Sequence, residues 1–149
     1  MRVYSELEIN SFRSMPKKVL NPLARWSQKP KRRPVHKQRN FHVVGMDDEK
    51  IRFMIYQRQN LKVLDDYSCG ISYIARGASP LTLARYNGAS HIHGDIAFQS
   101  HIHHATETAI ATGKRAESRA DASDRFETLE GALSLLVGRF QDKRFESRS

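Results

Sequence analysis

Five of the seven histidines lie in one stretch of the chain, residues 85–107 (RYNGASHIHGDIAFQSHIHHATE). Four of them form two His-x-His pairs, His91 with His93 and His101 with His103. In a strand, residues i and i+2 point to the same face, so each pair would direct two imidazoles the same way. Imidazole exchanges protons near neutral pH and is also the commonest metal ligand. The spacing therefore predicts that this stretch carries the chemistry of the protein.

The first chemistry that these residues suit is metal-free RNA cleavage. Transesterification at a 2′-hydroxyl needs a base, an acid and a cation beside the phosphate. Two histidines can transfer the protons, each contributing roughly 10²–10⁴-fold in rate, and Arg85 or Arg76 can stabilise the charge on the phosphate. Tyr86 can stack on a base or share the proton chemistry. The candidate catalytic residues are His91, His93, His101, His103, Arg85 and Tyr86.

A metal site is the second chemistry that the histidines suit. The run His101-x-His103-x-x-x-Glu107 resembles the first half of the cupin motif. Two imidazoles and one carboxylate suit Fe(II), Mn or Zn. The flanking glycines are displaced by one residue each, and no later histidine supplies the ligand of the second half. His91 or His93 would have to replace that ligand.

The histidines can also be ordinary residues of a sheet. The alternation His-Ile-His puts Ile92 and Ile102 on the face that packs against a core, which leaves the imidazoles to solvent or to a carboxylate. No P-loop, G-x-G-x-x-G or G-x-S-x-G motif is present. Neither a nucleotide cofactor nor a serine nucleophile is therefore expected, and the metal-free chemistry needs no cofactor.

The net charge of +9 is concentrated in one segment. Residues 11–40 contain ten Lys or Arg and no Asp or Glu, whereas residues 41–149 carry 14 basic and 14 acidic residues. Such a segment attracts polyanions through phosphate neutralisation and counterion release, and an acidic protein surface is the other partner that it suits. The cations expected to bind nucleic acid are Lys17, Lys18, Arg25, Lys29, Lys31, Arg32, Arg33, Lys37 and Arg39.

Local patterns predict the elements that position these residues. The run Ser5-Glu6-Leu7-Glu8 is a capping box that predicts a short helix, which Pro16 ends. Residues 28–40 contain two prolines and predict an extended basic strap. From Phe41 the apolar period changes to two, which predicts strands. They are a hairpin over 41–55 with an acidic turn, then strands over 69–75, 81–86 and 96–102.

The remainder of the chain has helical patterns. Residues 104–112 are Ala-rich and predict a helix, residues 117–123 a polar loop, and the leucines of 124–137 a second helix. The fold class is α+β, with a short N-terminal helix, a basic strap, a curved and mostly antiparallel sheet of about five strands, and two C-terminal helices. Residues 1–40 hold the first helix and the strap, residues 41–140 form the domain, and residues 141–149 are a frayed tail.

Composition bounds the setting of the protein. No apolar run approaches the roughly 20 residues that cross a bilayer, and the first ten residues lack the apolar core of a signal peptide. The single cysteine, Cys69, cannot form an internal disulfide. These features predict a cytoplasmic protein with no membrane partner.

The order of elements suggests a family. A short helix, a basic connection, a hairpin, the YIARG turn, a strand ending LARYNG and then His-x-His resemble small prokaryotic toxin-like proteins of toxin–antitoxin operons, namely the TumE-like group and its relatives. The residues concerned are Arg85-Tyr86-Asn87 and the histidines of 91–104. Two His-x-His pairs and a further C-terminal helix depart from that group, so no catalytic roles are carried over. The resemblance implies a small basic toxin that acts on RNA or the ribosome and is held by an acidic antitoxin.

The sequence therefore favours a toxin-like RNA-binding protein that is a metal-independent ribonuclease. The first alternative is a non-enzymatic inhibitor or adaptor, whose strap binds nucleic acid or an acidic protein. The second alternative is an enzyme with a metal held by His101, His103 and Glu107.

Overall fold

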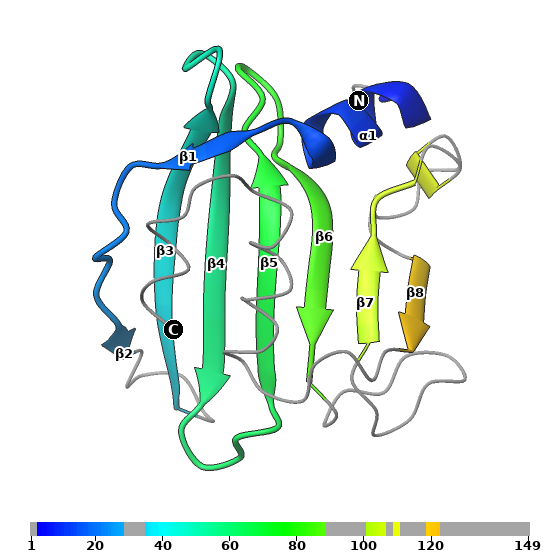
Figure 1. The fold of residues 1–149 in the computed structure, drawn as a ribbon. Coiled ribbons are helices and arrows are strands. Elements are labelled where there is room, and N and C mark those ends of the chain that lie inside the picture. The colour runs from blue at the N-terminus through cyan, green and yellow to red at the C-terminus, as the bar shows by residue number, and fades with distance from the viewer. Residues whose placement is uncertain (1–2, 29–34, 89–100, 107–108, 111–118, 123–149) are drawn as a thin grey trace.

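A single antiparallel sheet with one helix at its end makes up the described part of the chain (Figure 1). The computed structural model describes residues 3–28, 35–88, 101–106, 109–110 and 119–122. Strand order in the sheet is β1-β3-β4-β5-β6-β7-β8, and β2 pairs with β3 beside β1. The elements are α1 (Glu6–Ser14), β1 (Lys17–Val19), β2 (Ser27–Gln28), β3 (His36–Gly45), β4 (Arg52–Asn60), β5 (Tyr67–Tyr73), β6 (Leu81–Asn87), β7 (His101–His104) and β8 (Arg119–Ala122).

The predicted N-terminal helix is confirmed, together with its capping box. The Ser5 hydroxyl accepts from the Glu8 amide at 3.1 Å, and the Glu8 carboxylate accepts from the Ser5 amide at 3.2 Å. These two bonds satisfy amides that the first helical turn leaves without partners. The helix ends before Pro16, because Met15 adopts the extended conformation that a following proline favours.

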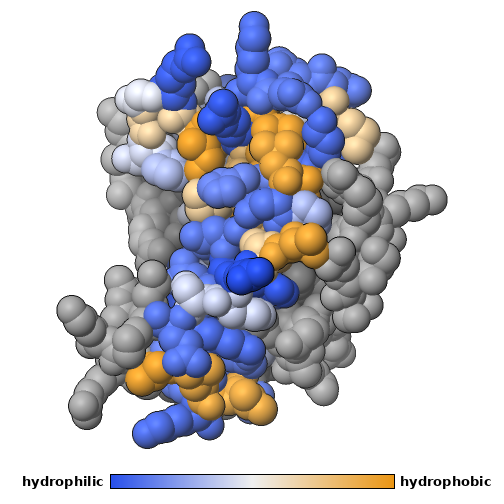
Figure 2. Space-filling view, turned by 90° about the vertical axis from the view of Figure 1, so that its left-hand side faces the viewer, coloured by the Kyte–Doolittle hydropathy of each residue, from blue (hydrophilic) through white to orange (hydrophobic). Residues whose placement is uncertain are grey.

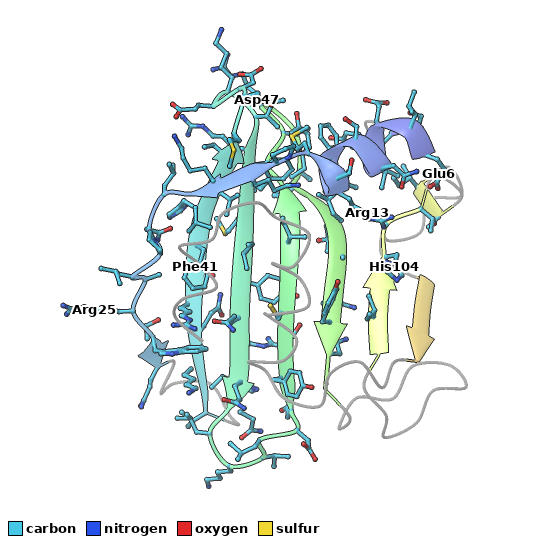
Figure 3. All side chains as sticks on the ribbon, viewed as in Figure 1. Glu6, Arg13, Arg25, Phe41, Asp47 and His104 are labelled. Carbon is cyan, nitrogen blue, oxygen red and sulfur yellow. The ribbon has the colours of Figure 1, made fainter. Side chains whose placement is uncertain are left out.

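Hydrogen bonds and aromatic packing hold helix α1 against the sheet near β6 and β7. The Arg13 guanidinium donates to the carbonyl of Leu83 at 2.9 Å and to that of Ala105 at 2.8 Å. The Phe12 ring stacks on that of Tyr73, with 4.1 Å between the ring centroids. Figure 3 shows Arg13 projecting from α1 towards these strands. The helix therefore covers part of the face of the sheet that carries the core.

The core lies on one face of the sheet, which we call the core face. Strand β4 shows the alternation, since Phe53, Ile55 and Gln57 are buried while Met54 and Tyr56 are only half-buried. A strand with one packed face and one more open face alternates in this way. The strand residues of the core are Phe41, Val43, Phe53, Ile55, Tyr67, Cys69, Ile71, Leu81, Leu83, Ala84, Tyr86 and Ile102.

The predicted β-hairpin and the two strands that follow it are confirmed. Strands β3 and β4 pair over nine residues, and the acidic turn between them carries Asp47 at its tip (Figure 3). Strands β5 and β6 follow the predicted segments 69–75 and 81–86, with Gly77 at a φ of 73° in the connecting turn. That left-handed conformation suits glycine because a side chain would be strained there. All the pairings among the described strands are antiparallel, where a mostly antiparallel sheet was predicted.

The prediction of an extended basic strap over residues 28–40 was wrong for the part that the structure describes. Strand β3 begins at His36 and runs across residue 40 without a break, pairing with β4 as far as Asn60. Residues 17–19 and 27–28 form β1 and β2, which both pair with β3. Backbone pairing at the sheet edge therefore orders this segment, although its side chains lack a clear apolar alternation. Residues 29–34 lie outside the described part of the chain.

The prediction of about five strands followed by two C-terminal helices was also wrong. The described part contains eight strands, and β8 lies within the predicted polar loop, where it pairs with β7. Of the predicted helix over 104–112, His104 ends β7 and only residues 109–110 are helical among those described. Backbone pairing with β7 overrides the polar character of 119–122. The predicted helix over 124–137 and the tail at 141–149 lie outside the described residues.

Candidate functional site

Strands β4 to β7 arrange a set of polar residues on the face opposite the core. Residues directly opposite one another in an antiparallel pair lie on the same face. One row across the sheet runs Tyr56, Gly70, Arg85, His103, and the next row runs Arg58, Ser68, Asn87, His101. We call the surface formed by these two rows the polar face.

Arg85 and His103 are neighbours in this arrangement. They are paired across β6 and β7, while Asn87 is paired with His101. Cβ atoms of such opposite residues stand about 5 Å apart. The register therefore brings the predicted phosphate-binding arginine next to one of the predicted acid–base histidines.

The Tyr56 side chain reaches the same site because its ring lies over Gly70 of β5. A Cβ atom built on Gly70 would stand 2.6 Å from Cε1 and 3.0 Å from the hydroxyl oxygen of Tyr56. The phenol ring therefore occupies the space above a residue that has no side chain. Its hydroxyl lies 3.0 Å from the Ser68 hydroxyl, within hydrogen-bond distance. Since Gly70 faces Arg85 in the next strand, the phenol points towards the arginine.

Most of the residues on the polar face are buried or half-buried. Ser68, Asn87 and His103 are 3%, 5% and 2% exposed, and Arg85 is half-buried. Burial raises the pKa of Tyr56, while the hydrogen bond with Ser68 and the positive charge of Arg85 act in the opposite direction. In a medium of low polarity, fixed charges and donors act more strongly on a bound anion than they would in water.

Tyr86 is not brought to the polar face. It pairs with Cys69 and Ile102, lies in the core and is 1% exposed. His91, His93 and Glu107 lie outside the described residues, and His101 is placed by its backbone pairing alone. The structure therefore brings Arg85 and His103 together, with His101 in register two residues away.

The basic residues of the segment 11–40 have several different environments. Lys17 is fully buried, and its ammonium group donates to the carbonyls of Arg13 and Met15. Lys18 pairs with Glu49 at 2.6 Å in the turn after β3. Arg25 is exposed and projects away from the sheet (Figure 3). Four further predicted cations lie outside the described residues, namely Lys29, Lys31, Arg32 and Arg33.

Lys37 and Arg39 form a cluster with Trp26 at the β2–β3 edge. The Lys37 ammonium lies 4.4 Å and the Arg39 guanidinium 4.3 Å from the centroid of the Trp26 ring. Arg39 also donates to the Gln57 side chain at 2.5 Å, on the core face. Figure 2 looks onto this edge of the molecule, where hydrophilic residues predominate among those coloured. We call Trp26, Lys37 and Arg39 the basic edge.

The basic edge and the polar face are separate surfaces. Strand β3 adjoins β4, but it lies three strands from Arg85 on β6 and four strands from His103 on β7, and four strand spacings correspond to about 19 Å. The register also puts Arg39 on the core face, with Gln57, whereas Arg85 lies on the polar face. The predicted nucleic-acid-binding cations and the predicted catalytic residues are therefore not brought into one groove by the described residues.

The described residues contain no group of three or more His, Cys, Asp or Glu side chains suited to a metal ion. Two of the three alternative ligands, His101 and Glu107, have side chains outside what the structure describes. Within the same part of the chain, no helix is long and apolar enough to cross a membrane.

Sequence reasoning missed Tyr56, Arg58 and Ser68. Tyr56 and Arg58 do alternate with buried residues of β4, and that pattern marks them as facing away from the core. Their proximity to Arg85 depends on the pairing of β4, β5 and β6. This pairing joins parts of the chain that are distant in sequence, so no local motif indicated it.

Comparisons with models of protein families, with curated proteins and with solved structures give no match for this chain.

Proposed function

We propose that this protein is an RNA-binding, metal-independent ribonuclease whose working surface is the polar face. The observation that carries the proposal is the direct pairing of Arg85 with His103 across β6 and β7. A cation and an imidazole side by side are the groups that a phosphodiester in transesterification requires. The resemblance to toxins of toxin–antitoxin operons supports RNA as the substrate, an acidic antitoxin as a partner and the cytoplasm as the setting.

The roles of the residues follow from the chemistry of the step. One histidine of the pair His101 and His103 takes the proton of the 2′-hydroxyl, and the 2′-oxygen forms a bond to phosphorus. The P–O bond to the 5′-oxygen breaks, and the other histidine gives that oxygen a proton. Arg85 balances the charge that gathers on the non-bridging oxygens. The products are a 2′,3′-cyclic phosphate and a free 5′-hydroxyl.

The experiment is an RNA cleavage assay with and without EDTA. We expect the purified full chain to cleave a labelled single-stranded RNA equally in both conditions. His103→Ala and Arg85→Ala should each reduce the rate by about 100-fold or more. His42→Ala is the matched control, because His42 is exposed on β3, far from these residues, and its rate should be unchanged. Cleavage abolished by EDTA would replace this proposal by the metal-site enzyme.

The basic edge favours a second candidate, a non-enzymatic RNA-binding protein. A tryptophan beside two cations can stack on bases and neutralise phosphates, and the edge lies away from Arg85 and His103. The same assay separates the two candidates. RNA that is bound but left intact by the wild type in every condition would leave binding as the function.

A further inference from the structure

We propose that Tyr56, Ser68 and Arg85 form a phosphate-binding site over Gly70, in which the Tyr56–Ser68 hydroxyl pair donates a hydrogen bond to a non-bridging oxygen of the RNA phosphate. This inference deepens the proposed ribonuclease function and rests on it for the identity of the natural ligand. It assigns to Tyr56 of β4 a contact with substrate that the core residue Tyr86 cannot make.

The absence of a side chain at Gly70 creates the site. A Cβ atom there would stand 2.6 Å from Cε1 and 2.9 Å from Cζ of Tyr56, closer than side chains pack. Any other residue would therefore push the phenol away from β5. Glycine within a strand weakens the strand and commonly marks a close approach of another group. Here the group that approaches is the Tyr56 ring.

The Tyr56 and Ser68 hydroxyls together have one hydrogen-bond donor left for a ligand. Tyr56 and Ser68 lie 3.0 Å apart, and either one can donate to the other. Each hydroxyl carries one donor, so their mutual bond uses one proton and leaves the second for an outside acceptor. Ser68 is buried and Tyr56 is half-buried, so this second donor lies where few waters compete for it.

The charge at the site favours an anion as that acceptor. Arg85 is opposite Gly70 in the register, and Arg58 is opposite Ser68. Burial raises the pKa of the Tyr56 hydroxyl, whereas the positive charges of both arginines favour its ionised form and act to lower that pKa. A planar guanidinium matches the geometry of a phosphate and remains charged at all relevant pH values.

The test measures phosphate binding without depending on cleavage. Inorganic phosphate is titrated into the full chain, with chloride of equal ionic strength as the reference, and the Arg85 side-chain NMR signal is followed. We expect saturable binding by the wild type. Tyr56→Phe should weaken it about tenfold, because a hydrogen bond to a charged group is lost. Tyr73→Phe is the matched control in the aromatic cluster under α1, and its affinity should be unchanged.

Gly70→Ala provides a second variant that leaves every polar group of the site in the chain. The added methyl group would displace the Tyr56 ring, so phosphate binding should weaken as in Tyr56→Phe. Phosphate that fails to bind the wild type, or that binds Tyr56→Phe as tightly, would overturn the inference.

The cleavage assay separates this inference from the proposed function. If phosphate binding depends on Tyr56 but RNA stays intact, the ribonuclease proposal fails and the anion site stands. If Tyr56→Phe cleaves RNA at the wild-type rate and KM, the phosphate site is wrong while the ribonuclease proposal stands.

Discussion

Lys17 is a cation that the fold uses inside the protein. Its side chain is fully buried, lies 4.7 Å from the Phe53 ring centroid and donates to two carbonyls at the end of α1. Burial lowers the pKa of Lys17 from 10.5 to about 8. The sequence predicts that Lys17 binds nucleic acid, but a buried ammonium group in this position cannot reach a phosphate on the surface.

The lowered pKa of Lys17 predicts that stability depends on pH. Between pH 8 and 10.5 the unfolded chain keeps the proton of Lys17 while the folded chain loses it, so this group makes the folded state more stable as pH rises. The gain amounts to at most about 3 kcal/mol. Urea unfolding of the wild type and of Lys17→Met across this range measures it.

The comparison with Lys17→Met isolates the lysine. Burial also raises the pKa of Cys69 to about 12 and raises that of Tyr56, and both shifts make the folded state less stable as pH rises. The difference in unfolding free energy between the two proteins cancels these shared contributions. A difference that does not change between pH 8 and 10.5 would contradict a lowered pKa for Lys17.

Among the elements, α1 depends on its cap. Ser5→Ala should reduce the free energy of unfolding by about 1 kcal/mol, because the Glu8 amide loses its acceptor at the start of the helix. Ser14→Ala, at the exposed end of the same helix, is the matched control and should change stability little. Chemical denaturation measures both variants. Equal losses in the two proteins would mean that the capping bond contributes nothing.

The elements that sequence predicted correctly are those coded by neighbouring residues. The capping box of α1, the hairpin of β3 and β4, and the strands β5 and β6 all follow from local alternation or turn residues. The short strands β1, β2 and β8 do not, because pairing with β3 or β7 stabilises them and their own side chains carry little signal. For the same reason the segment 36–40 resembled a strap although it continues β3.

The residues of the candidate site also differ in whether local sequence could predict them. Arg85 and the histidines could be predicted as site residues from their types and spacing. Tyr86 was predicted as a site residue as well, but the alternation of strand β6 directs its side chain into the core. Tyr56 could not be predicted as a site residue from the sequence, because its place in the site depends on the register of β4 with β5 and on the space above Gly70. Long-range pairing thus places Tyr56, and not the predicted Tyr86, on the face of the sheet that carries Arg85.

At the scale of the whole molecule, the sheet keeps two basic surfaces apart. The polar face carries Arg58 and Arg85, while Lys37 and Arg39 of the basic edge lie on the opposite face of the sheet, on β3, three strands from Arg85. Holding RNA and cleaving it are therefore separable activities in this account. An RNA that contacts only the polar face should still be cleaved, because the proposed chemistry needs nothing from the edge.

The chemistry at the ends of the RNA products tests the central claim most directly. The full chain is incubated with a defined RNA in EDTA, and the products are analysed by mass spectrometry beside an RNA carrying a single 2′-deoxynucleotide at the cleaved position. We predict a 2′,3′-cyclic phosphate and a 5′-hydroxyl, and no cleavage at the deoxy position, because the 2′-oxygen is the nucleophile. Products with a 3′-hydroxyl and a 5′-phosphate, or cleavage at the deoxy position, would contradict the account.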